Sequence, residues 1–285
     1  MKLGRRGLVA GGVGGVLLFA GLDCCTRVNG VIDQSSANSS NFEAIRNAME
    51  TTCLILVHEE DGEGGTTPVS QGSGSIVKFR TDVGDRYFCL TAYHVLRRYL
   101  DETQGYKIEI LSRNRKGVTF RAFGGTKVVR PVWVHDSKDL GILLLPKEFE
   151  IVGSNSSLVR DIPHLKRIHI PDSIRIGTTV RMLGYRHLRD GTFSYVLKEG
   201  IIASRVDHHP AVGNAMVFYI DQMANRGMSG GTVFLENGNG LGIVHGYLSE
   251  SGRLISMSDD LTVVVPYTYF YDILLDVASR GDILR

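Results

Sequence analysis

The sequence predicts an all-β protein of two units, closed by one α-helix at the C-terminal end. Short apolar stretches recur between residues 51 and 266, and many are rich in Val, Ile, Tyr and Phe, which favour strands. The residues between them are chiefly the turn formers Gly, Asp, Asn and Ser. About twelve strands over about 215 residues suit two barrels or sandwiches. The predicted strands include 53–58, 74–79, 87–91, 108–111, 128–134, 140–145, 178–183, 193–198, 217–220, 232–235, 242–247 and 261–265.

The composition narrows the class of protein. The chain has 285 residues, of which 43% are hydrophobic and 22% charged, and its net charge is +2. That is enough apolar material for one large domain or two small ones. No basic cluster is interleaved with aromatic residues, so we expect no nucleic-acid partner. The sequence contains no CxxC or HExxH motif, so we also expect no metal and no cofactor.

The first residues are typical of a targeting segment. Lys2, Arg5 and Arg6 precede an apolar, glycine-rich run over residues 7–22, which is the layout of a secretory signal. A twin-arginine signal, an uncleaved N-terminal anchor and a lipid on Cys24 remain alternatives. We therefore expect an exported protein, periplasmic or extracellular, which meets a membrane only through such an anchor or lipid.

The next segment connects this leader to the folded part. Residues 33–41 are rich in Ser and Asn and predict a linker. Asn41 is expected to cap a short helix over residues 42–49, before the folded domain begins near Thr51. We divide the chain into five parts: a signal peptide or anchor (residues 1–22), a linker with a short helix (23–50), a first β unit (51–147), a connection (148–174) and a second β unit with the terminal helix (175–285).

Two further features concern the body of the protein. Cys53 and Cys89 each lie in an apolar stretch, and they form either a disulfide, if their strands pair in register, or two buried thiols. Residues 267–278 predict a helix, because Phe270, Leu274 and Val277 then share one face. We expect this helix to pack on the body.

Three short segments carry the functional prediction. They are residues 90–95 (LTAYHV), residues 139–144 (DLGILL) and residues 227–231 (GMSGG). A serine hydroxyl needs a base to take its proton, and a neutral imidazole suits that task. A buried carboxylate fixes the imidazole's tautomer and stabilises the imidazolium.

These requirements select His94, Asp139 and Ser229 as a catalytic triad, in that order along the chain, with 45 and 90 positions between them. Asp136 is a rival to Asp139, which we prefer because the apolar strand follows it directly. The backbone N–H groups of Gly227 and Ser229 are expected to form the oxyanion hole, each typically worth ~3 kcal/mol in the transition state.

The three segments resemble the TAaHV, D-[LIV]-[AG]-[LIV]-[LIV] and G-x-S-G-G motifs of the chymotrypsin-like (trypsin-fold) serine peptidases. The resemblance extends from about Ser70 to Pro266 and includes residues 72–75 (GSGS). It is strongest to bacterial trypsin-like and Deg-type peptidases, here without a PDZ domain. Tyr93 departs from the usual alanine, and Thr232 from the usual proline. The resemblance implies two six-stranded antiparallel β-barrels with the active site in the cleft between them, a closing C-terminal α-helix and a polypeptide substrate.

By the same resemblance, Met223, Ala224, His245 and Tyr247 line the substrate-binding pocket. No Asp stands at the base of this pocket, so we do not expect cleavage after Lys or Arg. Some relatives bind a substrate side chain with a histidine on this strand, although His245 is one position late, which favours a half-buried structural histidine. Arg226 either contacts substrate or is solvated.

Three functions fit these residues. The first is a serine endopeptidase that works through an acyl-enzyme, and the second is a peptidase-fold binding module without turnover. The third is an α/β-hydrolase esterase, since GMSGG also fits G-x-S-x-G. That fold needs its acid and histidine after the serine, together with crossover helices that the sequence lacks, so we rank it last.

Overall fold

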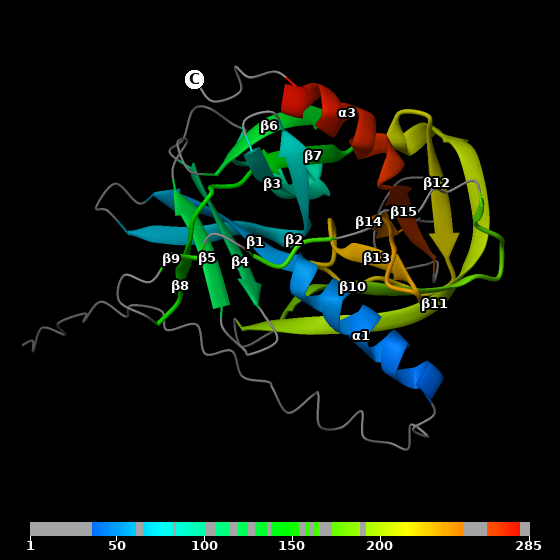
Figure 1. Cartoon of the computed structure of the whole chain (residues 1–285). Helices are drawn as coiled ribbons and strands as arrows, with labels where there is room; N and C mark the ends of the chain where they lie inside the picture. Colours follow the sequence, from blue (N-terminus) through cyan, green and yellow to red (C-terminus); the bar gives the residue numbers. More distant parts are fainter. Residues whose placement is uncertain are drawn as a thin grey trace, which may run out of the picture.

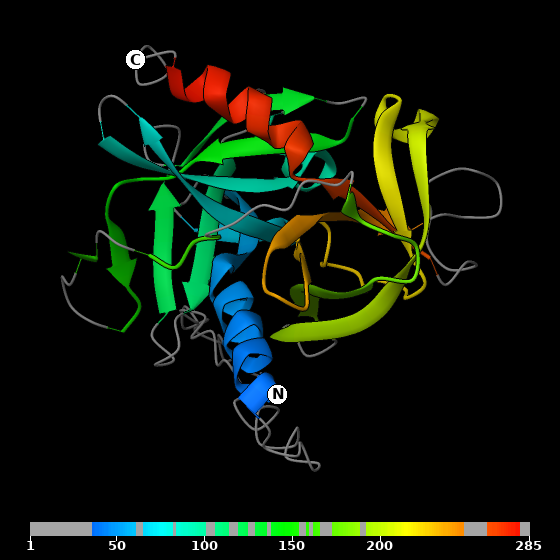
Figure 2. The ribbon, with the colours of Figure 1, turned by 45° about the vertical axis from the view of Figure 1, so that its right-hand side comes forward.

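The computed structural model describes residues 36–60, 65–81, 84–100, 106–113, 119–124, 129–135, 138–153, 158–159, 162–165, 173–188, 192–247 and 261–279. It is mostly β, with two sheets that lie side by side (Figures 1 and 2). The predicted targeting segment and Asp136 lie outside the described residues. None of the described helices is long and apolar enough to cross a membrane.

The first sheet has nine antiparallel strands in the order β6-β7-β3-β2-β1-β4-β5-β8-β9. Its strands are β1 (Thr52–Glu60), β2 (Thr66–Thr81), β3 (Gly84–Ala92), β4 (Tyr106–Arg113), β5 (Thr119–Gly124), β6 (Arg130–His135), β7 (Leu140–Leu144), β8 (Phe149–Ile151) and β9 (Leu158–Val159). The prediction of a closed six-stranded barrel is wrong for this half, because among the described residues the sheet stays open. Strands β8 and β9 have only three and two residues, so they offer few backbone groups that could close the sheet onto β6.

The second half is a closed six-stranded barrel, as predicted, in the order β10-β11-β12-β15-β14-β13. Pairing of β13 with β10 closes it. Its strands are β10 (Thr179–His187), β11 (Phe193–His209), β12 (Ala215–Ile220), β13 (Thr232–Leu235), β14 (Gly240–Tyr247) and β15 (Thr262–Pro266), with the short 3-10 helix η2 (Pro210–Val212) after β11.

Strand β7 is buried on both faces, although it belongs to an antiparallel sheet. Leu143 faces the core inside the first sheet, together with Cys89 of β3. Ile142 faces a second core, together with Leu90, which lies between this sheet, the barrel and the C-terminal helix. Because side chains alternate along a strand, β7 is clamped between two cores. It is therefore a rigid base for the residue that precedes it, Asp139.

Three α-helices complete the described structure: α1 (Ser36–Thr51), α2 (Tyr93–Leu96) and α3 (Thr268–Ser279). Helix α1 begins earlier than predicted, and Asn41 lies inside it rather than at its cap. Its Ala48 packs against Leu183 and Phe234 of the barrel. Helix α3 lies on the body of the protein, as predicted (Figure 1). Its Phe270 and Leu274 are fully buried in the second core.

Cys53 and Cys89 are free thiols in the structure, and both are fully buried. They lie on β1 and β3, on either side of β2, and their Sγ atoms are 3.4 Å apart. A Cβ on Gly74 of β2 would lie 2.3 Å from one sulfur and 3.1 Å from the other. The glycine therefore makes room for the two thiols to meet across the intervening strand.

Candidate active site

Ser229 lies in a tight turn between β12 and β13, over residues 225–231. Gly227 and Gly230 adopt φ values of 90° and 82°, which residues with a Cβ rarely adopt. A Cβ on Gly230 would lie 2.0 Å from the carbonyl oxygen of Ser73. The amide of Ser73 donates a 2.8 Å hydrogen bond to the Ser229 carbonyl. The glycines therefore let the turn press against β2 of the other sheet.

The backbone amides of this turn fall into two groups. Those of Met228, Gly230 and Gly231 each donate a hydrogen bond to a carbonyl oxygen of the protein. Within the described ranges, the amides of Gly227 and Ser229 donate none. These are the two N–H groups that the sequence predicted for an oxyanion hole, and they remain available to an acceptor from outside.

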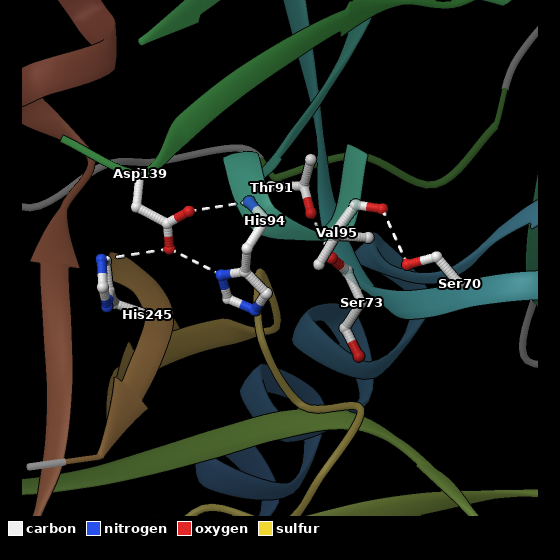
Figure 3. A network of polar contacts seen from close by, with 7 residues as sticks. All are labelled: Ser70, Ser73, Thr91, His94, Val95, Asp139 and His245. Carbon is white, nitrogen blue, oxygen red and sulfur yellow. Dashed lines mark hydrogen bonds and ion pairs between the residues drawn. The ribbon is translucent and has the colours of Figure 1, made fainter. Parts of the chain in front are cut away.

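Ser73 is a residue whose importance the sequence analysis missed. It is fully buried, and its Oγ donates to the Gly227 carbonyl at 2.7 Å and accepts from the Tyr185 amide at 2.8 Å. Thr91 in turn donates to the Ser73 carbonyl at 2.7 Å (Figure 3). The one signal in the sequence was the GSGS stretch at residues 72–75. Ser73 thus joins the serine turn, the barrel and the strand that leads to the histidine.

Asp139 holds His94 through its carboxylate and its backbone. His94 Nδ1 lies 2.7 Å from Asp139 Oδ2, and the His94 amide donates to Oδ1, also at 2.7 Å. The Tyr93 amide donates to the Asp139 carbonyl at 3.0 Å. Asp139 has a φ of 50°, in the left-handed region that Asp tolerates better than most residues. With Nδ1 as the donor to Asp139, Nε2 of the half-exposed His94 ring is left to accept a proton.

The ring of His245 reaches the same carboxylate from the barrel side. Its Nε2 lies 3.1 Å from Asp139 Oδ2, and its ring centroid is 6.4 Å from that of His94 (Figure 3). The side chain is 2% exposed, and burial lowers the pKa of His245 to about 4, against the opposing attraction of Asp139. This neutral, buried ring faces the carboxylate, which speaks against the substrate-binding role predicted for it.

The serine turn and the histidine strand are in contact, yet the two reactive groups are not hydrogen-bonded. A Cβ on Gly230 would lie 2.4 Å from Thr91 Oγ1, and Thr91 is three positions before His94. Across the described part of the chain, no hydrogen bond joins the Ser229 hydroxyl to His94. Catalytic hydrogen bonds are often loose without substrate, so the roles of the three residues stay predictions.

Met223 and Ala224, predicted to line the substrate pocket, are held in place by buried polar contacts. Thr262 accepts from the Ala224 amide at 2.7 Å and donates to the Gln222 carbonyl. Lys198 Nζ donates to the Met223 carbonyl at 2.5 Å. The pKa of Lys198 is lowered, mainly by partial burial and also by a nearby arginine. Sequence analysis did not single out this cation, because it lies on β11, far along the chain from the serine.

Two other predicted residues are less informative. Tyr247 ends β14, but its side chain lies outside the described residues. Arg226 is exposed beside Gly227, which fits either of its predicted roles. Their part in substrate binding stays a prediction.

An open antiparallel sheet that carries a His–Asp pair, and a closed six-stranded barrel whose serine turn contacts that sheet, define the class of chymotrypsin-like serine peptidase folds. The family model described as "Trypsin-like peptidase domain" matches residues 72–243, which is more than half of the chain. The chain therefore belongs to the trypsin-like peptidase domain family.

Solved structures are similar to the chain at the level of the fold. One is the crystal structure of Deg5, with 14% identity and a TM-score of 0.58, covering 86% of this chain and 95% of Deg5. Another is the HtrA-type protease AlgW with a tripeptide, with 18% identity and a TM-score of 0.56; the match covers 85% of this chain and 64% of that one. At these identities the likeness shows the fold alone. A comparison with curated protein sequences gives no significant match.

Proposed function

We propose that the chain is a serine endopeptidase that cleaves polypeptides through an acyl-enzyme. Ser229 Oγ attacks the scissile carbonyl carbon while His94 Nε2 takes the hydroxyl proton. The N–H groups of Gly227 and Ser229 donate to the oxyanion that forms. His94 then gives the proton to the leaving amine, and water hydrolyses the acyl-enzyme by the same route in reverse.

One observation carries most of this proposal: the two-point contact between Asp139 and His94. The backbone amide and Nδ1 of His94 both lie 2.7 Å from carboxylate oxygens of Asp139. A structural histidine needs only one partner for a buried nitrogen, whereas this ring is half exposed and oriented at Nδ1. That arrangement suits a base whose Nε2 must meet a substrate and a nucleophile.

The test is covalent labelling by a fluorophosphonate probe, which reacts with activated serines. We expect the wild-type protein to be labelled and Ser229→Ala to lose labelling completely. Ser204→Ala, on β11 of the barrel, is the matched control and should keep it. Labelling that survives Ser229→Ala would show that another residue is the nucleophile, and an unlabelled wild type would refute the activity.

A catalytically silent binding module is the second candidate. The observation that favours it is the missing hydrogen bond between the Ser229 hydroxyl and His94 among the described residues. Unfolded casein distinguishes the two functions. Cleavage supports the endopeptidase, and tight binding without cleavage supports the module.

We also propose that the protein is exported, on the sequence pattern of residues 1–22 alone. Fractionation of expressing cells, with N-terminal sequencing of the mature protein, tests this. Accumulation of the full-length chain in the cytosol would refute it.

A further inference from the structure

Two imidazoles, one from each half of the molecule, meet a single carboxylate oxygen. His94 Nδ1 lies 2.7 Å and His245 Nε2 lies 3.1 Å from Asp139 Oδ2. The His94 side chain is 48% exposed, whereas that of His245 is 2% exposed. His245 therefore has no access to substrate, and its ring acts on the site only through Asp139.

Burial favours a neutral His245 ring, which can donate from Nε2. Burial opposes its protonation most strongly, Asp139 attracts a proton to it, and His94 and His209 add to the opposition. A neutral imidazole carries one N–H. With that proton on Nε2, the ring presents a donor to the carboxylate. With the proton on Nδ1, it would instead present a lone pair to a negative charge, which is repulsive.

A β-bulge explains why His245 points at Asp139. Val244 of β14 pairs with Val264 and Gly246 pairs with Val263, so His245 is the extra residue between them. A bulge re-aims the side chain of its extra residue. The bulge therefore breaks the regular alternation of the strand at His245, whose ring lies against Asp139 and not at the surface.

The same strand also holds the nucleophile turn. The Val244 carbonyl accepts from the Gly230 amide at 2.6 Å, and the Val244 amide donates to the Gly231 carbonyl at 2.9 Å. Val244 thus fixes the backbone beside Ser229, while its neighbour His245 contacts Asp139. Strand β14 couples the position of the serine to the position of the acid.

We propose that His245 is a positioning residue that donates its Nε2 proton to Asp139 Oδ2 and so keeps the carboxylate aligned with His94 Nδ1. This inference rests on the proposed peptidase function. The contact distance already suits a hydrogen bond, although its angle does not, since His245 Nε2 has no hydrogen-bond partner among the described residues. The proposal therefore includes a reorientation of the ring that aligns the N–H with the oxygen.

Two substitutions separate positioning from simple packing. His245→Leu fills the space but has no donor, whereas His245→Gln keeps an N–H donor near the place of Nε2. His208→Gln, an exposed histidine of β11, is the control. We expect His245→Leu to lower kcat about 10- to 100-fold with KM little changed, because a hydrogen bond to a charged group is lost. His245→Gln should restore most of the rate.

Stability and pH dependence provide the readouts that a packing role would not give. His245→Leu should unfold at a lower urea concentration than His245→Gln, because it removes a hydrogen bond to a charged group that the Gln variant keeps. The acid limb of its kcat/KM profile should move to higher pH, because Asp139 then attracts the His94 imidazolium more strongly. A wild-type kcat and profile in His245→Leu would overturn the inference, as would equal losses in the Leu and Gln variants.

Nitrogen-15 NMR of the histidines tests the inference without any activity. In wild type, the signal of His245 should report a neutral ring protonated on Nε2, and His245→Leu should shift the low-field Nδ1–H proton of His94. A His245 ring protonated on Nδ1 would overturn the proposal even in an active enzyme. If the wild type fails to react with the fluorophosphonate probe, the proposed function fails, while the NMR result still decides the role of His245.

Discussion

At the scale of single residues, the site depends on two side chains whose importance only the fold reveals. Ser73 bridges the serine turn and the barrel through one hydroxyl, which donates to Gly227 and accepts from Tyr185. His245 and His94 approach Asp139 from opposite halves. The contacts of Ser73 with the turn and barrel, and of His245 with Asp139, each join residues that are at least 106 positions apart (245 − 139 for the nearest pair), so no local pattern predicts them.

The buried His245 ring also predicts a loss of stability in acid. Its pKa is about 4 in the folded state and near 6.5 when unfolded, so only the unfolded chain takes up the proton between these values. The contribution of the neutral His245 ring to the free energy of unfolding is therefore fully present above pH 6.5. It is lost as the pH falls towards 4. We expect wild type to lose about 2–3 kcal/mol more than His245→Gln between pH 7 and 4.5, by the linkage of pKa to stability.

Urea unfolding of both proteins at the two pH values measures this difference. Comparison with His245→Gln removes the effect of other groups that titrate over the same range. Parallel losses of stability in the two proteins would show that His245 is protonated in the folded state at pH 4.5.

At the scale of elements, the serine turn depends on a glycine that no other residue can replace. Gly230 combines a φ of 82° with a Cβ position 2.0 Å from a backbone oxygen. Gly177 has a similar φ of 87°, but a Cβ there meets nothing within 4 Å. Gly177→Ala should therefore cost about 1 kcal/mol, which is the backbone strain alone.

Gly230→Ala adds a clash with backbone to that strain, and we expect it to cost about 3 kcal/mol or more. It should also abolish labelling of Ser229, because the turn must move away from β2. Urea unfolding and probe labelling of the two variants check this. Equal effects of Gly177→Ala and Gly230→Ala would show that the turn does not press on β2.

The elements also show how far the sequence predicts the fold and the site. Strand β7 was predictable as a short, continuous apolar run, and the C-terminal helix α3 because its apolar residues follow the period of a helix. The three motif segments were predictable because each is continuous in sequence. The start of α1 was not predictable, because Ser and Asn favour caps and linkers in isolation. In the folded chain, contacts such as that of Ala48 with the barrel stabilise the helix. The bulge at His245 was not predictable, because strand register depends on a partner strand.

At the scale of the whole molecule, whether a sheet closes depends on strands far apart in the chain. The barrel closes because β13 and β10 pair directly, and the first sheet ends in short strands that do not close it. The halves are joined instead by side chains. The buried hydroxyls of Thr52 and Ser75 contact the hydroxyl of Thr232, and Tyr267 donates to Ser75. Thr232 stands at the position where relatives usually have proline.

This hydroxyl cluster predicts that the two halves unfold together only while Thr232 is present. Thr232 Oγ1 lies 2.6 Å from Thr52 Oγ1 and 2.8 Å from Ser75 Oγ, and so links β13 of the barrel to β1 and β2 of the sheet. Thr232→Val keeps the shape but leaves two buried hydroxyls without this partner, which should cost about 2–3 kcal/mol. Trp133, the only tryptophan of the sequence, lies on β6 and packs against the second core, so its fluorescence reports the contact between the first sheet, the barrel and helix α3. In wild type, urea transitions by its fluorescence and by far-UV circular dichroism should coincide; in Thr232→Val they should separate, because the barrel loses a buried link to the sheet.

Thr179→Val, on β10 and away from this cluster, is the control and should keep a single transition. Coincident transitions with unchanged midpoints in Thr232→Val would show that the Thr232 hydroxyl is not needed to hold the halves together.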